Sequence, residues 1–421
     1  MSPKRDHYDC IIIGGGPAGA TAATVLADHG RSVLVLEKDT FPRHHIGESL
    51  MPHTHATFAR IGMLEKLAAS DFPRKESVQF VSASGRESDP FFFPDWRPEP
   101  SSTTWQVPRD RFDPLMLDNA REHGAEVHNG VRVGQVLFEG EQAVGVRAVF
   151  GGAERDIRAA VVVDASGLGA VIARQLRLTE HDPRLRNGAI YGYFRGAYRD
   201  AGRNAGATII LYTPTRDGWF WFIPLPDDLT SVGIVATPEY LFRGRGDQPQ
   251  RTLADEIAGC PAAQRRLDGA EQVGGVYVTR DFSYRARRIA GPGWLLCGDA
   301  FGFLDPVYSS GLMLALKMGE LGADAIHDAL AAGDVSAKRL GRHEEMIVAG
   351  MTSIRRLVYA FYDRNFSFGR FLADHPQQKD NLTRILVGDV FNAEVPRIFE
   401  FMKDYADIGS LETPAAPART S

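Results

Sequence analysis

Residues 8–37 read YDCIIIGGGPAGATAATVLADHGRSVLVLE, two short apolar runs separated by a glycine-rich turn and a longer segment. Tyr8–Ile13 predicts a first strand, the residues from the turn to Gly30 predict a helix, and Ser32–Leu36 predicts a second strand. This order is a β-α-β unit, the building block of a parallel sheet.

The turn matches the G-x-G-x-x-G pattern and comprises Gly14, Gly15, Gly16, Pro17, Ala18 and Gly19. In such a turn the first glycine allows the bend, the second admits a pyrophosphate and the third allows close packing of the helix, whose N-terminus favours an anion. Glu37 ends the second run and can accept hydrogen bonds from ribose hydroxyls, which predicts a dinucleotide without a 2′-phosphate. The alternative is a glycine-rich turn with an ordinary surface glutamate.

Length and composition set wide bounds. The 421 residues suit one large domain or two to three fused ones, and 44% hydrophobic and 24% charged residues are typical of a folded globular protein. A net charge of −5 disfavours nucleic acid as a partner. Three separated cysteines predict neither disulfides nor a zinc site, and the polar start Met1–Asp9 with no long apolar run predicts a cytoplasmic protein without a membrane span.

Further strands are predicted at Ala159–Val163, before Asp-Ala-Ser-Gly, and at Gly293–Leu296, before Cys-Gly-Asp-Ala. Residues 186–240 carry short aromatic-rich runs broken by Gly and Pro, which predict a mostly antiparallel second sheet. Residues 311–408 are mainly helical in pattern, and Glu412–Ser421 predicts a loose tail.

Several segments favour FAD over a nicotinamide cofactor. They are the opening turn, Val107–Ala125 with Arg109, Arg111, Phe112 and Asp113, then Asp164–Gly167, and Cys297–Ala300. Together they resemble the FAD-dependent monooxygenase superfamily. The resemblance implies an α/β fold with an aromatic-hydroxylase-like, Rossmann-type FAD-binding domain, an interleaved antiparallel β-sheet substrate domain and a helical C-terminal region. It also implies that Asp299 contacts the ribityl and pyrophosphate portion of FAD. The single fingerprint indicates no separate nicotinamide domain.

The division that we expect assigns residues 1–80, 105–185 and 280–335 to the FAD-binding domain and residues 81–104 and 186–279 to the substrate domain. Residues 336–410 form the C-terminal helical region, and residues 411–421 the flexible tail.

Three motifs narrow the family: FPRHHIGESLMP at residues 41–52, GWFWFIP at 218–224 and DPVYSSG at 305–311. The combination is similar to the flavin-dependent halogenases, and within them to the subgroup that acts on phenolic or pyrrolic substrates, often tethered to a carrier protein. The resemblance implies cofactor contacts by Gly14, Gly16, Pro17, Ala18, Gly19, Glu37, Lys38, Ile46, Gly47, Ser49, Arg109, Asp299, Pro306, Gly311 and Leu312.

The resemblance also implies catalytic roles for Trp219, Trp221 and Lys75. The two tryptophans would form a wall that keeps organic substrate away from the flavin, and the alternative is an ordinary strand with aromatics on one face. Lys75 would hold the oxidised halogen, either by hydrogen bonding as an ammonium or covalently as an amine whose pKa burial has lowered. The alternative is an exposed lysine in a charged loop.

Ser310 and Gly311 match the positions where the family holds its halide, at the start of a helix whose backbone N–H groups favour anions. Alternatively they only cap that helix and touch the flavin. Tyr308 departs from the tryptophan halogenases, which carry a glutamate there, and this disfavours an indole substrate.

Two other features have structural explanations. His44, His45, His53 and His55 lack the spacing of a known metal site, so we predict no metal. Phe91–Phe93 is compatible with a tunnel lining and with core packing alike.

We therefore expect an FAD-dependent halogenase of antibiotic-type secondary metabolism that uses reduced flavin from a separate reductase, O2 and chloride or bromide. Its substrate would be an electron-rich aromatic compound, free or bound to an acyl or peptidyl carrier protein. The alternatives are a flavin monooxygenase or geranylgeranyl-reductase-like enzyme that does not halogenate, and a carrier-interacting flavoprotein that has lost catalysis.

Overall fold

The predicted β-α-β unit is present in the computed structural model, which describes residues 3–245 and 248–410. It consists of strand β1 (His7–Ile13), helix α1 (Pro17–Asp28) and strand β2 (Val33–Glu37). The two strands are parallel and largely buried, as in sheets that are covered on both faces.

The other strands of this first sheet are β7 (Glu126–Asn129), β8 (Arg132–Glu139), β9 (Gln142–Phe150), β10 (Ala153–Asp164), β18 (Ala290–Gly291) and β19 (Trp294–Leu296). β1 pairs in parallel with β2 on one side and with β10 on the other, followed by β7 and β19 respectively. Strand order therefore reverses at β1, the place where open α/β sheets form a ligand crevice. β8, β9 and β18 pair antiparallel at the margins.

A second sheet of seven strands runs in the order β16-β12-β15-β14-β13-β4-β5. Its members are β4 (Ser77–Val81), β5 (Phe91–Phe92), β12 (Asn187–Arg195), β13 (Thr208–Tyr212), β14 (Gly218–Pro224), β15 (Leu229–Ala236) and β16 (Glu271–Phe282). All neighbours are antiparallel except β13 and β4, so the predicted antiparallel sheet is confirmed with one parallel pair. β4 joins this sheet although the expected division counts residues 77–80 with the FAD-binding domain; the division itself stays a prediction.

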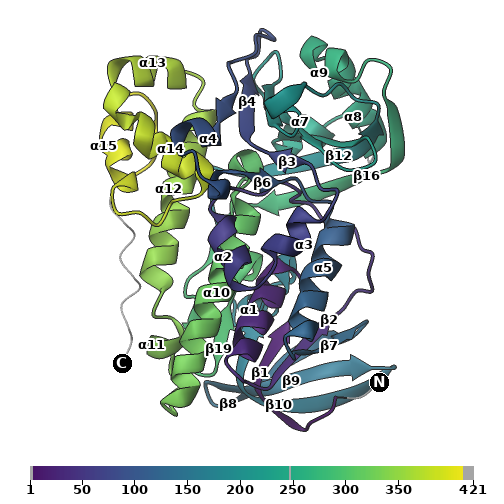
Figure 1. The fold of residues 1–421 in the computed structure, drawn as a ribbon, viewed down its shortest axis with the longest axis vertical. Coiled ribbons are helices and arrows are strands. Elements are labelled where there is room, and N and C mark those ends of the chain that lie inside the picture. Colours follow the sequence, from purple (N-terminus) through teal and green to yellow (C-terminus); the bar gives the residue numbers. More distant parts are fainter. Residues whose placement is uncertain (1–2, 246–247, 411–421) are drawn as a thin grey trace.

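Smaller sheets pair β3 (Arg74–Lys75) with β6 (Thr104–Trp105), and β11 (Thr179–His181) and β20 (Gly302–Phe303) with β17 (Tyr284–Ala286). Besides α1, the helices described outside the C-terminal region are α2 (Thr54–Arg60), α3 (Leu64–Ala68), α4 (Phe93–Trp96), α5 (Arg109–Glu122), α6 (Val171–Gln175), α7 (Pro238–Phe242), α8 (Pro249–Ala258) and α9 (Pro261–Arg266). In Figure 1 the first sheet with α1 and α5 occupies the lower half and the second sheet lies above it.

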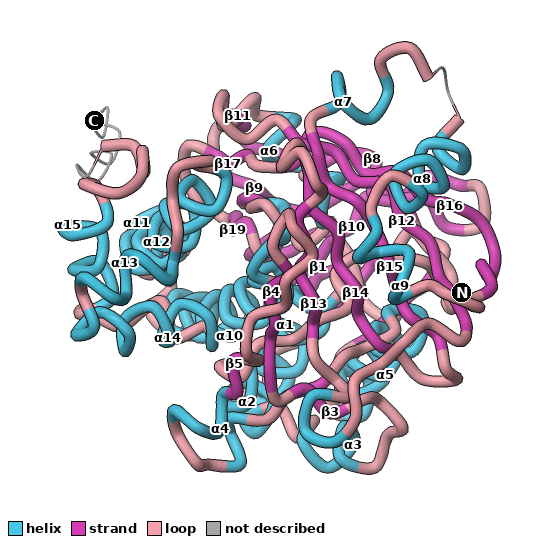
Figure 2. The backbone as a smooth tube through the Cα atoms, turned by 90° about the horizontal axis from the view of Figure 1, so that it is seen from above, coloured by secondary structure: helices cyan, strands magenta, loops and turns pink. Residues whose placement is uncertain are grey.

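The C-terminal region is helical, as predicted, with α10 (Ser310–Ala331), α11 (Ala337–Leu340), α12 (Glu344–Tyr362), α13 (Phe368–Asp374), α14 (Lys379–Val387) and α15 (Ile398–Met402). Seen from above, these helices lie on the side of the molecule opposite α8 and α9 (Figure 2). No helix among the described residues is both long enough and apolar enough to cross a membrane. The predicted tail falls on residues outside the described ranges.

Side chains alternate between the two faces of the second sheet. Trp219, Trp221 and Ile223 on β14 join the main core, which continues into the first sheet and the C-terminal helices. Phe220 and Phe222 point to the other face and pack in a separate core beneath α7–α9. Because both faces are covered, β14 is buried at every position.

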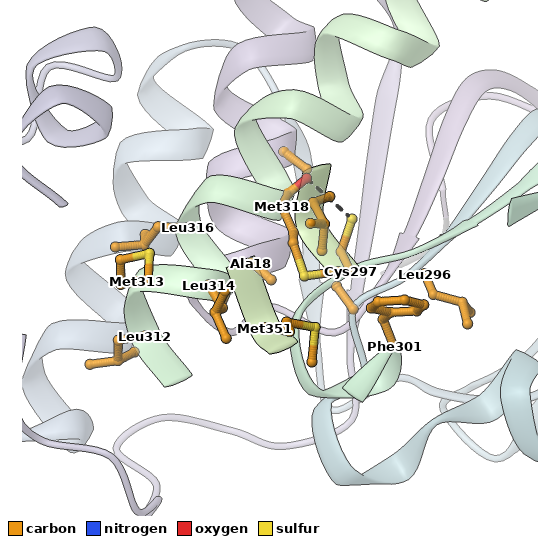
Figure 3. Close-up of a cluster of buried hydrophobic side chains, with 14 of the residues drawn as sticks. Ala18, Leu296, Cys297, Phe301, Leu312, Met313, Leu314, Leu316, Met318 and Met351 are labelled. Carbon is orange, nitrogen blue, oxygen red and sulfur yellow. Dashed lines mark hydrogen bonds between the residues drawn. The ribbon is translucent and has the colours of Figure 1, made fainter. Parts of the chain in front are cut away.

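The main core also ties α10 to the first sheet. Figure 3 shows Leu314 and Met318 on α10 packed beside Ala18 of α1, Cys297 and Phe301. The Cys297 thiol donates to the Met318 carbonyl oxygen at 3.6 Å. The segment between β19 and α10 begins at the carboxyl end of the first sheet. It is held by packing and by this hydrogen bond to α10.

Gly233→Ala tests how tightly the second sheet holds Trp221. A Cβ at Gly233 on β15 would lie 2.3 Å from Trp221 Cζ2, so the ring must move. We expect a loss of about 1–3 kcal/mol in the free energy of unfolding, measured by urea denaturation. The matched control is Gly275→Ala on β16, where a Cβ would meet nothing within 4 Å. Equal stability of the two variants would contradict the packing described.

Candidate flavin site

One large cavity of about 590 Å³ lies between the carboxyl ends of the first sheet and one face of the second. Its walls include the ends of β1, β2, β10 and β19 and side chains of β13 and β14. Of the predicted site residues, Gly14, Gly16, Pro17, Ala18, Glu37, Lys38, Ile46, Gly47, Ser49, Arg109, Trp219, Trp221, Asp299, Pro306, Gly311 and Leu312 line it. Gly19, Lys75 and Ser310 are not on its wall.

The glycine-rich turn forms one end of the cavity. Gly14 has φ +102°, which suits glycine, and a Cβ there would lie 2.4 Å from the Ala165 carbonyl oxygen. A Cβ on Gly19 would lie 2.0 Å from the Gly14 carbonyl oxygen. Gly19 therefore supports the turn from behind, which is the packing role predicted for the third glycine.

Glu37 is buried at the end of β2 and holds the turn in place. Its carboxylate accepts from the Gly15 N–H at 2.7 Å and from the Asp39 N–H at 2.9 Å. Each carboxylate oxygen has a second lone pair, so both can still accept from a ribose hydroxyl in the cavity.

Arg43 is a cavity residue whose role the sequence motifs did not reveal. Its guanidinium lies beside the turn, 3.6 Å from the position of a Gly16 Cβ, and forms an ion pair with buried Asp113 at 2.9 Å. Its Nε is buried 3.9 Å from an Asp39 carboxylate oxygen, and the side chain lies on the cavity wall. A guanidinium beside a pyrophosphate-type turn is suited to a phosphate oxygen. The only hint in the sequence was a basic residue shortly after Glu37.

Arg109 lies on the same wall and is oriented by several partners. Its Nε and Nη2 donate to the two oxygens of Asp113 at 2.6 and 2.9 Å. Its Nη1 donates to the carbonyl oxygens of Ile46 and Gly47, which fixes the segment that follows Arg43. Asp113 thus joins two arginines that face the cavity.

Asp299 follows β19 and is half-buried on the cavity wall. Burial raises the pKa of its carboxyl group to about 7, against the attraction of Arg109. Its carboxyl group makes no hydrogen bond to another residue in the described part of the chain. A bound sugar hydroxyl would supply the missing donor. Together with Glu37 and the Arg43 guanidinium, this donor and acceptor set fits FAD.

Trp219 and Trp221 form part of the opposite wall from β14. The Trp221 Nε1–H donates to Ser231 Oγ at 3.0 Å, and the Trp219 Nε1–H donates to the Tyr362 hydroxyl at 2.8 Å. Both indoles are therefore held at their polar edge as well as by packing. The space behind Trp219 is filled by Phe361, with ring centroids 6.1 Å apart.

Tyr362 connects Trp219 to the segment before α10. Its hydroxyl donates to buried Asp305 at 2.8 Å, and Asn187 donates to the same oxygen at 2.9 Å. The other oxygen of Asp305 accepts from the Val307 N–H at 3.2 Å and caps the 3-10 turn Pro306–Tyr308. Burial raises the pKa of Asp305 to about 6. The tryptophan wall and the predicted halide loop are thus linked through one carboxylate.

The predicted halide loop opens α10 at the cavity. Ser309 has φ +57° and precedes the first turn of this helix of 22 residues, whose leading N–H groups have no partner within the helix. A Cβ on Gly311 would meet nothing within 4 Å, so its backbone faces open space. Ser310 is buried and does not line the cavity. Tyr308 is buried too, and its hydroxyl donates to the Leu357 carbonyl oxygen at 3.2 Å.

Lys75 is not an exposed loop lysine. It lies on β3 with 3% of its surface exposed, and its Nζ donates to Ser49 Oγ at 2.8 Å and to the Leu50 carbonyl oxygen at 3.0 Å. The Phe93 ring lies 5.7 Å from Nζ. Burial lowers the pKa of the amine to about 7, with no carboxylate contributing. Near neutral pH this amine is therefore partly uncharged.

The other predicted features have structural roles. His44 stacks on Tyr277 with centroids 3.6 Å apart, and His45 contacts the Ile46 carbonyl oxygen. Phe91–Phe93 does not line the cavity, and Phe93 is core. Within residues 3–245 and 248–410, no group of three or more His, Cys, Asp or Glu residues is arranged to hold a metal ion.

Comparisons with known proteins agree with this geometry. The family model of an FAD binding domain matches residues 7–317. A 1H-pyrrole-2-carbonyl-(peptidyl-carrier protein) chlorinase of Pseudomonas fluorescens is 31% identical over 420 residues, covering 95% of this chain and 93% of that relative. The chain belongs to the flavin-dependent halogenases. This halogenase is an FAD-dependent enzyme with a halide as co-substrate.

Other relatives agree. A 1H-pyrrole-2-carbonyl-(peptidyl-carrier protein) brominase of Pseudoalteromonas luteoviolacea is 33% identical and covers 93% of this chain and 95% of that relative. The solved structure of the flavin-dependent brominase Bmp2 superposes with a TM-score of 0.86 at 32% identity, covering 94% of the halogenase and 98% of that chain. The predicted fold class is thereby confirmed.

Arg43→Met tests the phosphate end of the cavity. We expect about tenfold weaker FAD binding, measured by fluorescence quenching of the flavin, because a charge-assisted bond to phosphate is lost. Asp113 keeps its two bonds from Arg109, so the fold should persist. The control is Arg147→Met, which removes an exposed ion pair with Asp156 on β9 and β10. Unchanged affinity in Arg43→Met would rule out a phosphate contact there.

Tyr362→Phe tests the link between the tryptophan wall and Asp305. The variant leaves Trp219 Nε1 without its acceptor and removes a donor from Asp305, so the free energy of unfolding should fall by about 1–3 kcal/mol. The raised pKa of Asp305, about 6, means that its carboxylate is charged at pH 8 and largely protonated at pH 5. Because a charged acceptor makes the stronger bond, the loss should be larger at pH 8.

Urea denaturation at both pH values measures this difference. The control is Tyr405→Phe, which removes an exposed hydroxyl bonded to Asp374. An equal loss at pH 5 and pH 8 in Tyr362→Phe would argue against a charged Asp305 in the link.

Proposed function

We propose that this halogenase transfers an oxidised halogen to an electron-rich aromatic ring, phenolic or pyrrolic, in secondary metabolism. The observation that carries the proposal is the buried Lys75 amine, which lies next to a flavin-sized cavity and has no carboxylate partner. An amine with a pKa near 7 is available both as a hydrogen-bond donor and as a nucleophile.

Each wall of the cavity has its own task. The glycine-rich turn, Glu37, Arg43, Arg109 and Asp299 bind and orient FAD, with Lys38, Ile46, Gly47, Pro306 and Leu312 completing its surroundings. When bound and reduced, FAD supplies the electrons that, with O2 and halide, generate the electrophilic halogen. The backbone N–H groups of Ser310 and Gly311 hold the halide at the start of α10. Trp219 and Trp221 keep organic substrate away from the flavin.

The substrate class follows from the relatives and from Tyr308. Two relatives are named for pyrrole-2-carbonyl groups on a peptidyl carrier protein, which supports a carrier-bound pyrrole for this enzyme. Burial raises the pKa of the Tyr308 hydroxyl well above its usual value, so it remains a neutral donor and does not serve as a base. A pyrrole or phenol is electron-rich enough to react without one.

Two further assignments complete the proposal. Reduced FAD comes from a separate flavin reductase, because the sequence carries one dinucleotide fingerprint. The enzyme works in the cytoplasm, an assignment supported by three cysteines that are all free and buried.

Lys75→Met tests the proposal. The variant should lose the halogenated product by a factor of about 100 or more, since the group that positions the halogen is gone, while reduced FAD is still oxidised by O2. Product is read by mass spectrometry with bromide and chloride on a pyrrolyl carrier protein and on free phenols and pyrroles. The control is Lys66→Met, which removes an exposed ion pair with Glu122. Addition of oxygen or hydrogen without halogen in the wild type would instead support a monooxygenase or reductase.

A further inference from the structure

The Lys75 amine does not itself reach the cavity, and two hydroxyl groups stand between them. Ser49 and Thr208 both line the cavity, and both side chains are buried. Ser49 Oγ accepts from Lys75 Nζ at 2.8 Å and lies 2.9 Å from Thr208 Oγ1. Thr208 is on the same face of β13 as Ile210, the residue that pairs with Trp221 of β14. A continuous chain of polar atoms therefore joins the amine to the cavity.

Gln106 fixes the orientation of this chain. Its side-chain amide contacts the Gly206 carbonyl oxygen and Thr208 Oγ1, both at 2.9 Å. Because a carbonyl oxygen can only accept, the nitrogen of the amide must face this side, and its second hydrogen is donated to Thr208. Gln106 Oε1 has no hydrogen-bond partner among the described residues. The amide therefore binds its surroundings through the two N–H bonds to Gly206 and Thr208.

Donors enter the hydroxyl pair from both ends. Lys75 donates to Ser49, and Gln106 donates to Thr208. One hydroxyl hydrogen is used between Ser49 and Thr208, and the other has no acceptor within the described residues. The positive charge of Lys75 favours the order in which hydrogens point away from it, so Ser49 donates to Thr208 and Thr208 presents its O–H to the cavity.

Among the described residues, no charged side chain is paired with the amine. The charged side chains on surrounding elements have partners elsewhere: Arg74 lies over Trp105, Glu76 and Asp95 bind Arg203, and Glu48 accepts from Tyr193. The strand that carries Lys75 also lies tightly against the start of β13, because a Cβ at Gly206 would lie 1.8 Å from the Arg74 carbonyl oxygen. Lys75 is thus connected to the cavity through the hydroxyl groups of Ser49 and Thr208.

We propose that Ser49 and Thr208 form a proton relay between the Lys75 amine and the flavin cavity, with Gln106 as the residue that orients it. In the relay one N–H bond of the ammonium breaks as Ser49 Oγ gains that proton. The former Ser49 proton passes to Thr208 Oγ1, and the former Thr208 proton passes to an oxygen acceptor in the cavity. Lys75 is left as a neutral amine and the acceptor gains one proton, with no change in electrons.

The overall reaction consumes a proton, which the relay would supply; this role of the relay rests on the proposed function. Reduced flavin, O2, halide, one proton and a substrate C–H give oxidised flavin, the C–halogen bond and two waters. One proton is consumed per turnover, and the cavity is enclosed by protein. Lys75 supplies that proton through the relay and becomes the neutral amine that can bind an electrophilic halogen. Ser49 and Thr208 carry this proton, and Gln106, which holds Thr208, is a positioning residue.

Hydrogen exchange of the Lys75 ammonium tests the relay without any turnover. The sequence has eight lysines, so labelling lysine with 15N gives a simple spectrum, and Lys75→Met assigns the signal. In the FAD-free protein at pH 6, below the lysine's pKa of about 7, Thr208→Val should slow exchange about tenfold, the worth of one hydrogen bond. Thr208→Ser, which keeps the hydroxyl, should restore most of the exchange.

The control is Thr230→Val on β15 of the same sheet, where the buried hydroxyl has no partner among the described residues. Ser49→Ala breaks the chain one atom closer to Lys75 and gives a second measurement if Thr208→Val fails to fold. Exchange in a folded Thr208→Val protein that equals the wild-type rate would overturn the relay, as would slowing of the same size in Thr230→Val.

A second readout separates the relay from the function itself. In single turnovers with halide and substrate, Thr208→Val should give about tenfold less halogenated product per FAD oxidised. Slowed exchange in Thr208→Val, together with a wild-type enzyme that makes no halogenated product, would uphold the relay and refute the proposed function. Normal exchange together with normal halogenation in Thr208→Val would refute the relay and uphold the proposed function.

Discussion

The arrangement of this halogenase depends on keeping one amine out of water without a counter-charge. Burial penalises the ammonium form, and no carboxylate offsets it, so the pKa of Lys75 falls to about 7. The amine is held by a serine hydroxyl, a backbone carbonyl and an aromatic face. Ser49 and Leu50 are consecutive residues, whereas Phe93 and Lys75 come from two other segments, and the fold has to bring the three segments together.

Both sheets contribute to that enclosure. The first sheet provides the turn and the carboxylates and arginines that fit a dinucleotide, while the second turns one face of β13 and β14 toward the same cavity. Asp305, Tyr362 and Trp219 join that face to the start of α10, so the tryptophan wall, the proposed halide loop and the C-terminal helices form one hydrogen-bonded unit. The amine and the cavity are thereby held at a fixed separation, which the hydroxyl groups of Ser49 and Thr208 bridge.

The sequence predicted what is local or periodic. The G-x-G-x-x-G turn with Glu37, the antiparallel second sheet and the shared face of Trp219 and Trp221 follow from spacing alone, and the family resemblance singled out Lys75. Contacts between distant segments could not be predicted. Tyr362 lies 143 residues from Trp219, and Thr208 lies 159 residues from Ser49. Nothing in the local pattern around Thr208 distinguishes it from any other strand threonine until the sheet places it beside Lys75.

A crystal structure of the protein with FAD and bromide tests the central claim most directly, because bromide is located by its anomalous scattering. We expect the pyrophosphate beside Gly16 and Arg43, the flavin ring against the face of β13 and β14 that carries Thr208, Ile210 and Trp221, and bromide near the backbone of Ser310 and Gly311. A flavin ring away from that face, or bromide bound away from α10, would contradict this claim, because Lys75 would then have no connection to the reacting centre.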